Sequence, residues 1–158
     1  MKPIPEEVVV ASWKRIIKLP DSEIEILMDE MQDKQPYLSE YLVSADTDIF
    51  NDEEHTLFYS LGIIVWKIIS SGNLKLKKVL SKTIEQNEEL NLKLVKSFTT
   101  QDEFNSFVDV TFEKYNQKTL LLFIILQLIQ NEKEQKSPPE TYGNMLLLLK
   151  TEIDCLDQ

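Results

Sequence analysis

The stretch that decides the fold is residues 51–72, which read NDEEHTLFYSLGIIVWKIISSG. Asn51 is a favourable helix N-cap, and the three acidic residues after it suit the positive end of a helix dipole. The second half of the stretch is apolar on nearly every side until Ser70-Ser71-Gly72 ends it. A helix that is apolar all round must be enclosed by other elements. The sequence therefore predicts a central helix here, with the rest of the chain packed around it.

Gly62 interrupts this apolar run. Glycine in a helix interior costs about 1 kcal/mol relative to alanine, so its presence calls for a reason. Close approach of a neighbouring helix explains it better than contact with a ligand.

Helix signals recur on both sides of this stretch. Capping boxes or a proline in the first turn predict further helix starts at Pro5, Ser22, Pro36, Thr100 and Ser137. The lysine-rich segment from Lys75 is expected to open a helix that continues to Lys96. The apolar run 120–129 is predicted to be helical, because no second β-branched run could pair with it as a strand. We expect one all-α domain over residues 1–158: an irregular or orthogonal bundle of seven to eight helices, two of them enclosed (about 57–69 and 120–129).

Several kinds of residue that enzymes commonly use are scarce in this chain. It has 3 glycines, 1 histidine and 1 cysteine, so Gly-rich phosphate loops and intrachain disulfides are excluded. His55 follows Asp52 in a D-x-x-H spacing, but a di-iron bundle needs a second histidine, and we interpret His55 as a solvated residue near a helix start. Cys155 is expected to be a small packed residue. The composition favours a non-catalytic protein without a cofactor.

Carboxylates offer one route to catalysis, because hard cations need only oxygen ligands. Helical spacing places Glu85, Glu88 and Glu89 on one face, and Asp109 and Glu113 on one face of the next predicted helix. If the two faces met, they could hold Mg²⁺ or Mn²⁺ in a metal-dependent hydrolase. The alternative is an ordinary solvated surface with a Glu89–Lys93 pair.

Charge is unevenly distributed along the chain. The net charge is −10 and the pI about 4.6, which disfavours nucleic acid and anionic membrane as partners. Residues 1–54 hold 14 acids and 5 bases, whereas residues 55–98 hold 3 acids and 7 bases. The candidate partner-binding residues are Lys75, Lys77, Lys78 and Lys82 as a basic patch, and Tyr37 and Tyr41 as the lining of a shallow groove. The alternatives are that the acidic N-terminal segment covers the lysines and that the tyrosines only pack.

The most favoured function is a protein–protein interaction or regulatory module whose N-terminal acids contact a basic partner. The runner-up functions are the carboxylate-metal hydrolase and a carrier of an apolar ligand bound between the two enclosed helices. The chain shows no signal-peptide pattern, and its longest apolar run is about half of what spans a bilayer, so we expect a cytoplasmic protein.

Overall fold

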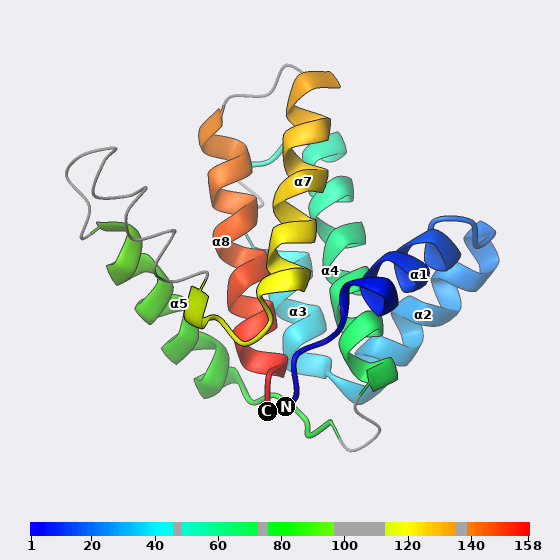
Figure 1. The fold of residues 1–158 in the computed structure, drawn as a ribbon, viewed down its shortest axis with the longest axis horizontal. Coiled ribbons are helices and arrows are strands. Elements are labelled where there is room, and N and C mark those ends of the chain that lie inside the picture. Colours follow the sequence, from blue (N-terminus) through cyan, green and yellow to red (C-terminus); the bar gives the residue numbers. More distant parts are fainter. Residues whose placement is uncertain (46–48, 73–75, 97–112, 135–138) are drawn as a thin grey trace.

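The computed structural model describes residues 1–45, 49–72, 76–96, 113–134 and 139–158 (Figure 1). This part of the chain contains seven helices and no strand, which confirms the predicted all-α class. The helices are α1 (Glu6–Ile16), α2 (Asp21–Lys34), α3 (Pro36–Ser44), α4 (Asp52–Gly72), α5 (Ser81–Lys96), α7 (Lys118–Glu134) and α8 (Pro139–Leu156).

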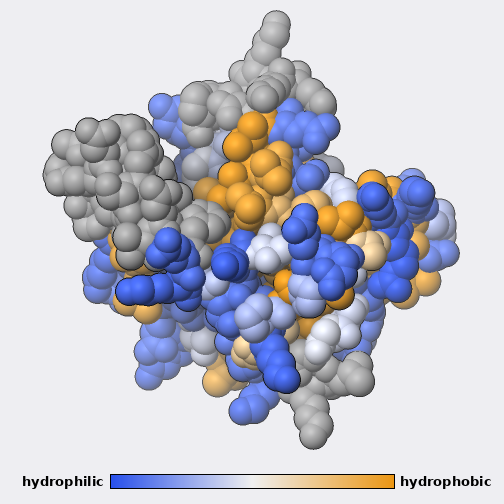
Figure 2. All heavy atoms as spheres, viewed as in Figure 1, coloured by the Kyte–Doolittle hydropathy of each residue, from blue (hydrophilic) through white to orange (hydrophobic). Residues whose placement is uncertain are grey.

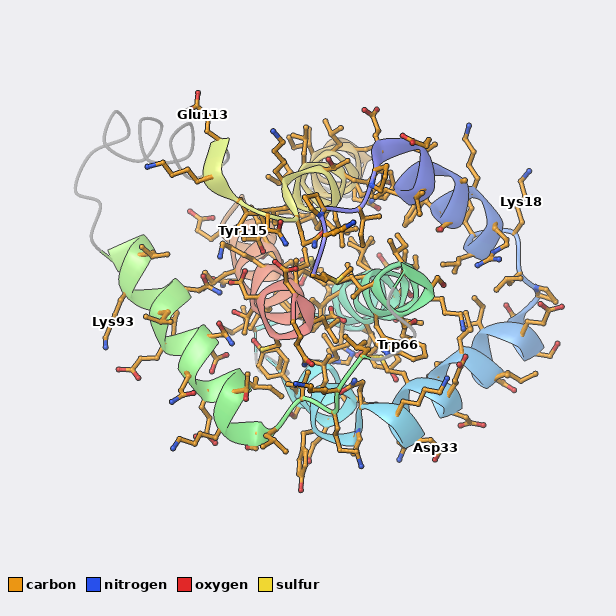
Figure 3. All side chains as sticks on the ribbon, turned by 60° about the horizontal axis from the view of Figure 1, so that its bottom comes forward. Lys18, Asp33, Trp66, Lys93, Glu113 and Tyr115 are labelled. Carbon is orange, nitrogen blue, oxygen red and sulfur yellow. The ribbon has the colours of Figure 1, made fainter. Side chains whose placement is uncertain are left out.

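Three helices, α4, α7 and α8, form the centre of the bundle, and α8 packs against both of the others (Figures 1 and 3). On one side, α5 packs along α8. On the other side, α1 lies against α4 and α7, and α2 lies against α3 and α4. The two chain ends meet at one end of the bundle, where the Met1 amine lies 3.2 Å from Asp157 Oδ1.

The start of α4 is fixed by a reciprocal capping box. The Glu54 N–H donates to Asn51 Oδ1 at 3.0 Å, and the Asn51 N–H donates to Glu54 Oε2 at 2.9 Å. These bonds satisfy backbone donors that a helix start would otherwise leave free. Asn51 therefore acts as predicted, and Glu54 is a partner that the sequence analysis missed. Residues 61–66, Ile68 and Ile69 of α4 are buried, as the sequence predicted, while Lys67 is only partly buried.

The prediction that residues 120–129 are enclosed is wrong for one face of α7. Leu120, Ile124 and Leu128 are buried, but Leu122, Leu126 and Ile129 are 50%, 54% and 42% exposed. The apolar pattern could not reveal this, because a helix that is apolar all round offers no polar face to mark the solvent side.

Two predicted helix starts differ from the structure. α2 begins at Asp21 after Pro20, with no side-chain cap, so Ser22 is inside the helix rather than capping it. Residues 76–80 are not helical, and α5 starts only at Ser81. The buried Gln35 side chain bonds to the backbone of this non-helical segment: its Nε2 donates to the Lys77 carbonyl at 2.9 Å, and its Oε1 accepts from the Val79 N–H at 2.7 Å. The predicted starts at Thr100 and Ser137 lie outside the described residues.

Gly62 lies at a close contact between helices of the core. A Cβ at this position would lie 2.7 and 2.9 Å from the two Leu42 methyl groups and 3.2 Å from Glu152 Oε2. Leu42 belongs to α3 and Glu152 to α8, so both helices close over α4 at this point. The packing explanation for Gly62 agrees with this geometry.

We predict that Gly62→Ala destabilises the protein, although alanine is the better helix former. The methyl group must displace Leu42, which is fully buried, and overpacking of this kind costs about 1–3 kcal/mol, more than the propensity gain. Gly143→Ala is the matched control: it lies in α8 with nothing within 4 Å of the new Cβ, and should gain about 0.5–1 kcal/mol. Urea unfolding of both variants and of wild type measures these changes in the free energy of unfolding. Stabilisation by both substitutions would contradict the close-packing account.

Candidate functional site

The carboxylates proposed as metal ligands do not come together in the part that the structure describes. Glu85 accepts from the Ser81 hydroxyl at 3.2 Å, Glu88 accepts from the Tyr41 hydroxyl at 3.1 Å, and Glu89 pairs with Lys93 at 2.6 Å. Glu113 is exposed, and Asp109 lies outside the described residues. Among the described residues, no group of three or more His, Cys, Asp or Glu side chains is placed to hold a metal ion.

His55 and Cys155 both occupy packed positions. The His55 Nε2 lies 3.1 Å from the Val43 carbonyl oxygen, and the ring stacks on Tyr59 at 6.5 Å between centroids, so the side chain is half-buried rather than freely solvated. Cys155 is buried and unpaired, and burial raises the pKa of its thiol to about 12. Since the thiolate is the nucleophile, Cys155 is suited to packing and not to thiol chemistry.

The candidate basic patch is open to solvent where it is described. Lys77, Lys78 and Lys82 are exposed and take part in none of the salt bridges among the described residues, so no acidic side chain there covers them. Lys75 lies outside the described residues. Tyr37 is 45% exposed, whereas Tyr41 is half-buried and bonded to Glu88 across the α3–α5 contact. The two tyrosines therefore differ in environment: Tyr37 lies at the surface, and Tyr41 lies in the contact between α3 and α5.

A polar cluster joins α5 to α8. The Asp154 carboxylate accepts hydrogen bonds from the Tyr115 hydroxyl, the Lys150 ammonium at 2.7 Å and the Asn91 amide at 2.9 Å. The Lys150 ammonium also lies 4.9 Å from the centre of the Tyr115 ring, which points toward α8 in Figure 3. Burial and the Asp154 charge raise the pKa of Tyr115, so its hydroxyl stays protonated and continues to donate.

An open cleft of about 390 Å³ lies beside this cluster, lined by Asn87, Leu90, Asn91, Lys93, Leu94, Lys150 and Asp154. The polar groups of Asn91, Lys150 and Asp154 bond to one another, so none of these three is left for a ligand without breaking an existing bond. The cluster therefore serves best as a clamp that holds α5 on α8.

Glu152 is the least expected buried residue of the core. It is 0% exposed, and both carboxylate oxygens lack a hydrogen-bond partner among the described residues. Its neighbours at the junction of α3, α4 and α8 are Leu42 and Gly62. Burial raises its pKa well above the usual value, so the carboxyl is protonated over a wide pH range. No sequence pattern marks Glu152 as buried, because its burial depends on which side of α8 meets α4.

We predict that Glu152 makes the protein less stable as pH rises above the ordinary carboxyl pKa of 4.5. The unfolded chain releases this proton there, whereas the folded state keeps it until its own, raised pKa. Stability then falls by at most about 1.4 kcal/mol per pH unit. Glu152→Gln, which is neutral at every pH, should remove this loss and be the more stable protein at alkaline pH. Urea unfolding across the pH range tests this, with the exposed Glu85→Gln as the control. Parallel stability–pH curves for Glu152→Gln and wild type would contradict it.

The outer face of α2 carries an acidic row with an apolar residue beside it. Asp21, Glu25, Asp29 and Asp33 follow one another at every fourth position, and all four are exposed. Ile26, next to them, is 63% exposed. Within α2, the lone base is Lys34, which pairs with Glu30 and not with the row. The spacing is present in the sequence, but the total charge of the segment alone does not reveal it.

The exposed face of α7 forms one wall of a groove against α1. The groove has a volume of about 1060 Å³ and is lined by Glu6, Val9, Val10, Glu113, Lys118, Thr119, Leu122, Phe123, Ile125, Leu126 and Gln127. Figure 2 shows the apolar surface gathered over α7, with hydrophilic surface beside it. This is the largest of the described pockets. The described pockets lie at the surface and not between α4 and α7, where an apolar-ligand carrier would need one.

Comparison with protein-family models, with curated proteins and with solved structures found no match to this chain. None of the described helices combines the length and the apolar character needed to cross a membrane. The function is therefore argued from the surfaces and side chains alone.

Proposed function

We propose that this protein is a non-catalytic binding module that recognises a basic protein partner through the outer face of α2. The observation that carries the proposal is the acidic row Asp21, Glu25, Asp29 and Asp33, which is exposed and pairs with no base among the described residues. We place the module in the cytoplasm, since its single cysteine is unpaired and buried.

The acidic row works against the stability of its own helix. Like charges four residues apart destabilise a helix by about 0.2–0.5 kcal/mol per pair, and the row contains three consecutive pairs. Asp33 also lies in the last turn, where the helix dipole disfavours negative charge. A basic partner would relieve this repulsion.

Ile26 gives the same face an apolar anchor. It is flanked on the helix surface by Glu23 and Asp29, three residues to either side, and both are exposed. Protein interfaces commonly combine a few apolar anchors with a polar rim, and complementary charge adds association rate and specificity. We therefore expect Ile26 to supply the apolar anchor of the interface and the acidic row to raise the association rate and the specificity.

We predict that neutralising the four carboxylates of the row removes partner binding without lowering the stability of the protein. The variant Asp21→Asn, Glu25→Gln, Asp29→Asn, Asp33→Asn should be as stable as wild type or up to about 1 kcal/mol more stable, because repulsion is removed. It should fail to retain proteins that the wild type retains from an extract of the source cells at low salt. Urea unfolding and quantitative mass spectrometry of the retained proteins measure the two effects.

The control variant changes net charge by the same amount at four exposed carboxylates elsewhere: Glu40→Gln, Glu53→Gln, Glu85→Gln and Glu140→Gln. It should retain the same proteins as wild type, and high salt should release them from both. Equal losses in the two variants would mean that total charge alone governs retention, and the α2 proposal would fail.

A further inference from the structure

The apolar groove between α1 and α7 is not used by the α2 surface. Its wall on α7 includes Leu122 and Leu126. The exposed Ile129 follows three residues after Leu126, outside the groove lining, so the three side chains lie along one line of the helix. At about 1.5 Å rise per residue, this line runs about 10 Å, or two helical turns. Each of these three side chains is at least 42% exposed. They therefore do not gain the free energy of burial that the fully buried side chains of the core gain.

We infer that this groove receives the apolar face of an amphipathic helix belonging to the basic partner. The inference rests on the proposed function for the sign of the partner's charge, and adds a second, independent contact surface. A partner helix in this mode places apolar side chains at i, i+3 or i+4, and i+7, which is the spacing that α7 itself presents.

The openness of the groove favours a helix over a small molecule. Its volume of about 1060 Å³ matches the upper end of the range of about 300–1,000 Å³ typical of small-molecule pockets, but such pockets enclose most of their ligand. Leu122 and Leu126 are 50% and 54% exposed, so this groove lies open along α7, over which Figure 2 shows apolar surface. An elongated ligand with its own backbone bonds satisfied, such as a helix, suits this shape.

Charge at the rim favours a basic helix. Glu6 and Glu113 line the groove, and the exposed Glu7 follows Glu6 at the start of α1, while Lys118 in the lining and the exposed Lys114 supply two positive charges. A second copy of this chain is the competing occupant. Each copy carries a net charge of −10, and a symmetric contact would bring the same rim carboxylates near each other. Charge complementarity therefore selects a basic partner over self-association.

The test uses three synthetic helical peptides. The first carries leucines at i, i+3, i+4 and i+7 with lysines elsewhere; the second keeps the leucines and replaces lysine by glutamate; the third keeps the composition of the first with the leucines scattered. Fluorescence anisotropy should show that wild type binds the first at least tenfold more tightly than either of the others.

The variant Leu122→Ser, Leu126→Ser should weaken binding of the first peptide about tenfold or more, because it removes the apolar wall. The matched control is Leu80→Ser, Leu90→Ser, which changes two leucines that are 57% and 59% exposed and lie outside the groove. The control should bind as wild type does. Circular dichroism checks that all variants keep their helices.

Several outcomes would overturn the inference: equal binding by the groove variant and its control, equal binding of the lysine and glutamate peptides, or a wild-type dimer in sedimentation that the groove variant disperses. The α2 variant separates this inference from the proposed function. If the α2 variant still binds the first peptide and still retains the extract proteins, the groove inference holds and the α2 proposal fails. If the α2 variant loses the extract proteins and the groove variant binds the first peptide as wild type does, the α2 proposal holds and the groove inference fails.

Discussion

The close packing of α3 and α8 against α4 at Gly62 is the contact on which the rest of the structure depends. The absence of a Cβ at Gly62 lets Leu42 and Glu152 lie directly against the α4 backbone. α8 is thereby fixed along the central helix, and it in turn supports α5 and α7. One residue without a side chain thus sets the spacing of the bundle, because close-packed interiors tolerate little added volume.

The same contact explains why Glu152 is an unusual residue. Its position on α8 faces α4, so the chain must bury the carboxyl to close the bundle, and protonation is the least costly way to do so. Lys150 and Asp154 lie two residues to either side of Glu152 on α8, but they pair with each other beside α5. Asn91 and Asp154 at the α5–α8 contact are therefore bonded, whereas the Glu152 carboxyl has no hydrogen-bond partner among the described residues.

Several candidate site residues that lie close together in the sequence have different neighbours in the structure. The carboxylates Glu85, Glu88 and Glu89 do share one helix, but each has a different neighbour and the described residues assemble no metal site. Tyr37 and Tyr41 are close in sequence, yet one is at the surface and the other is bonded to α5. Helical spacing reports which residues share a face, and it carries no information about which helix that face meets.

The sequence by itself determined the helical class, the cap at Asn51, the proline start at Pro36 and the uneven charge. These features act over one helical turn or add up along the chain, so local chemistry is enough to infer them. Only the tertiary structure decided that α7 keeps one apolar face in solvent, that Gln35 bonds to the backbone of the non-helical residues 76–80, and that Glu152 is buried. Burial and hydrogen bonding between distant segments depend on which elements become neighbours, and that is a property of the packed bundle.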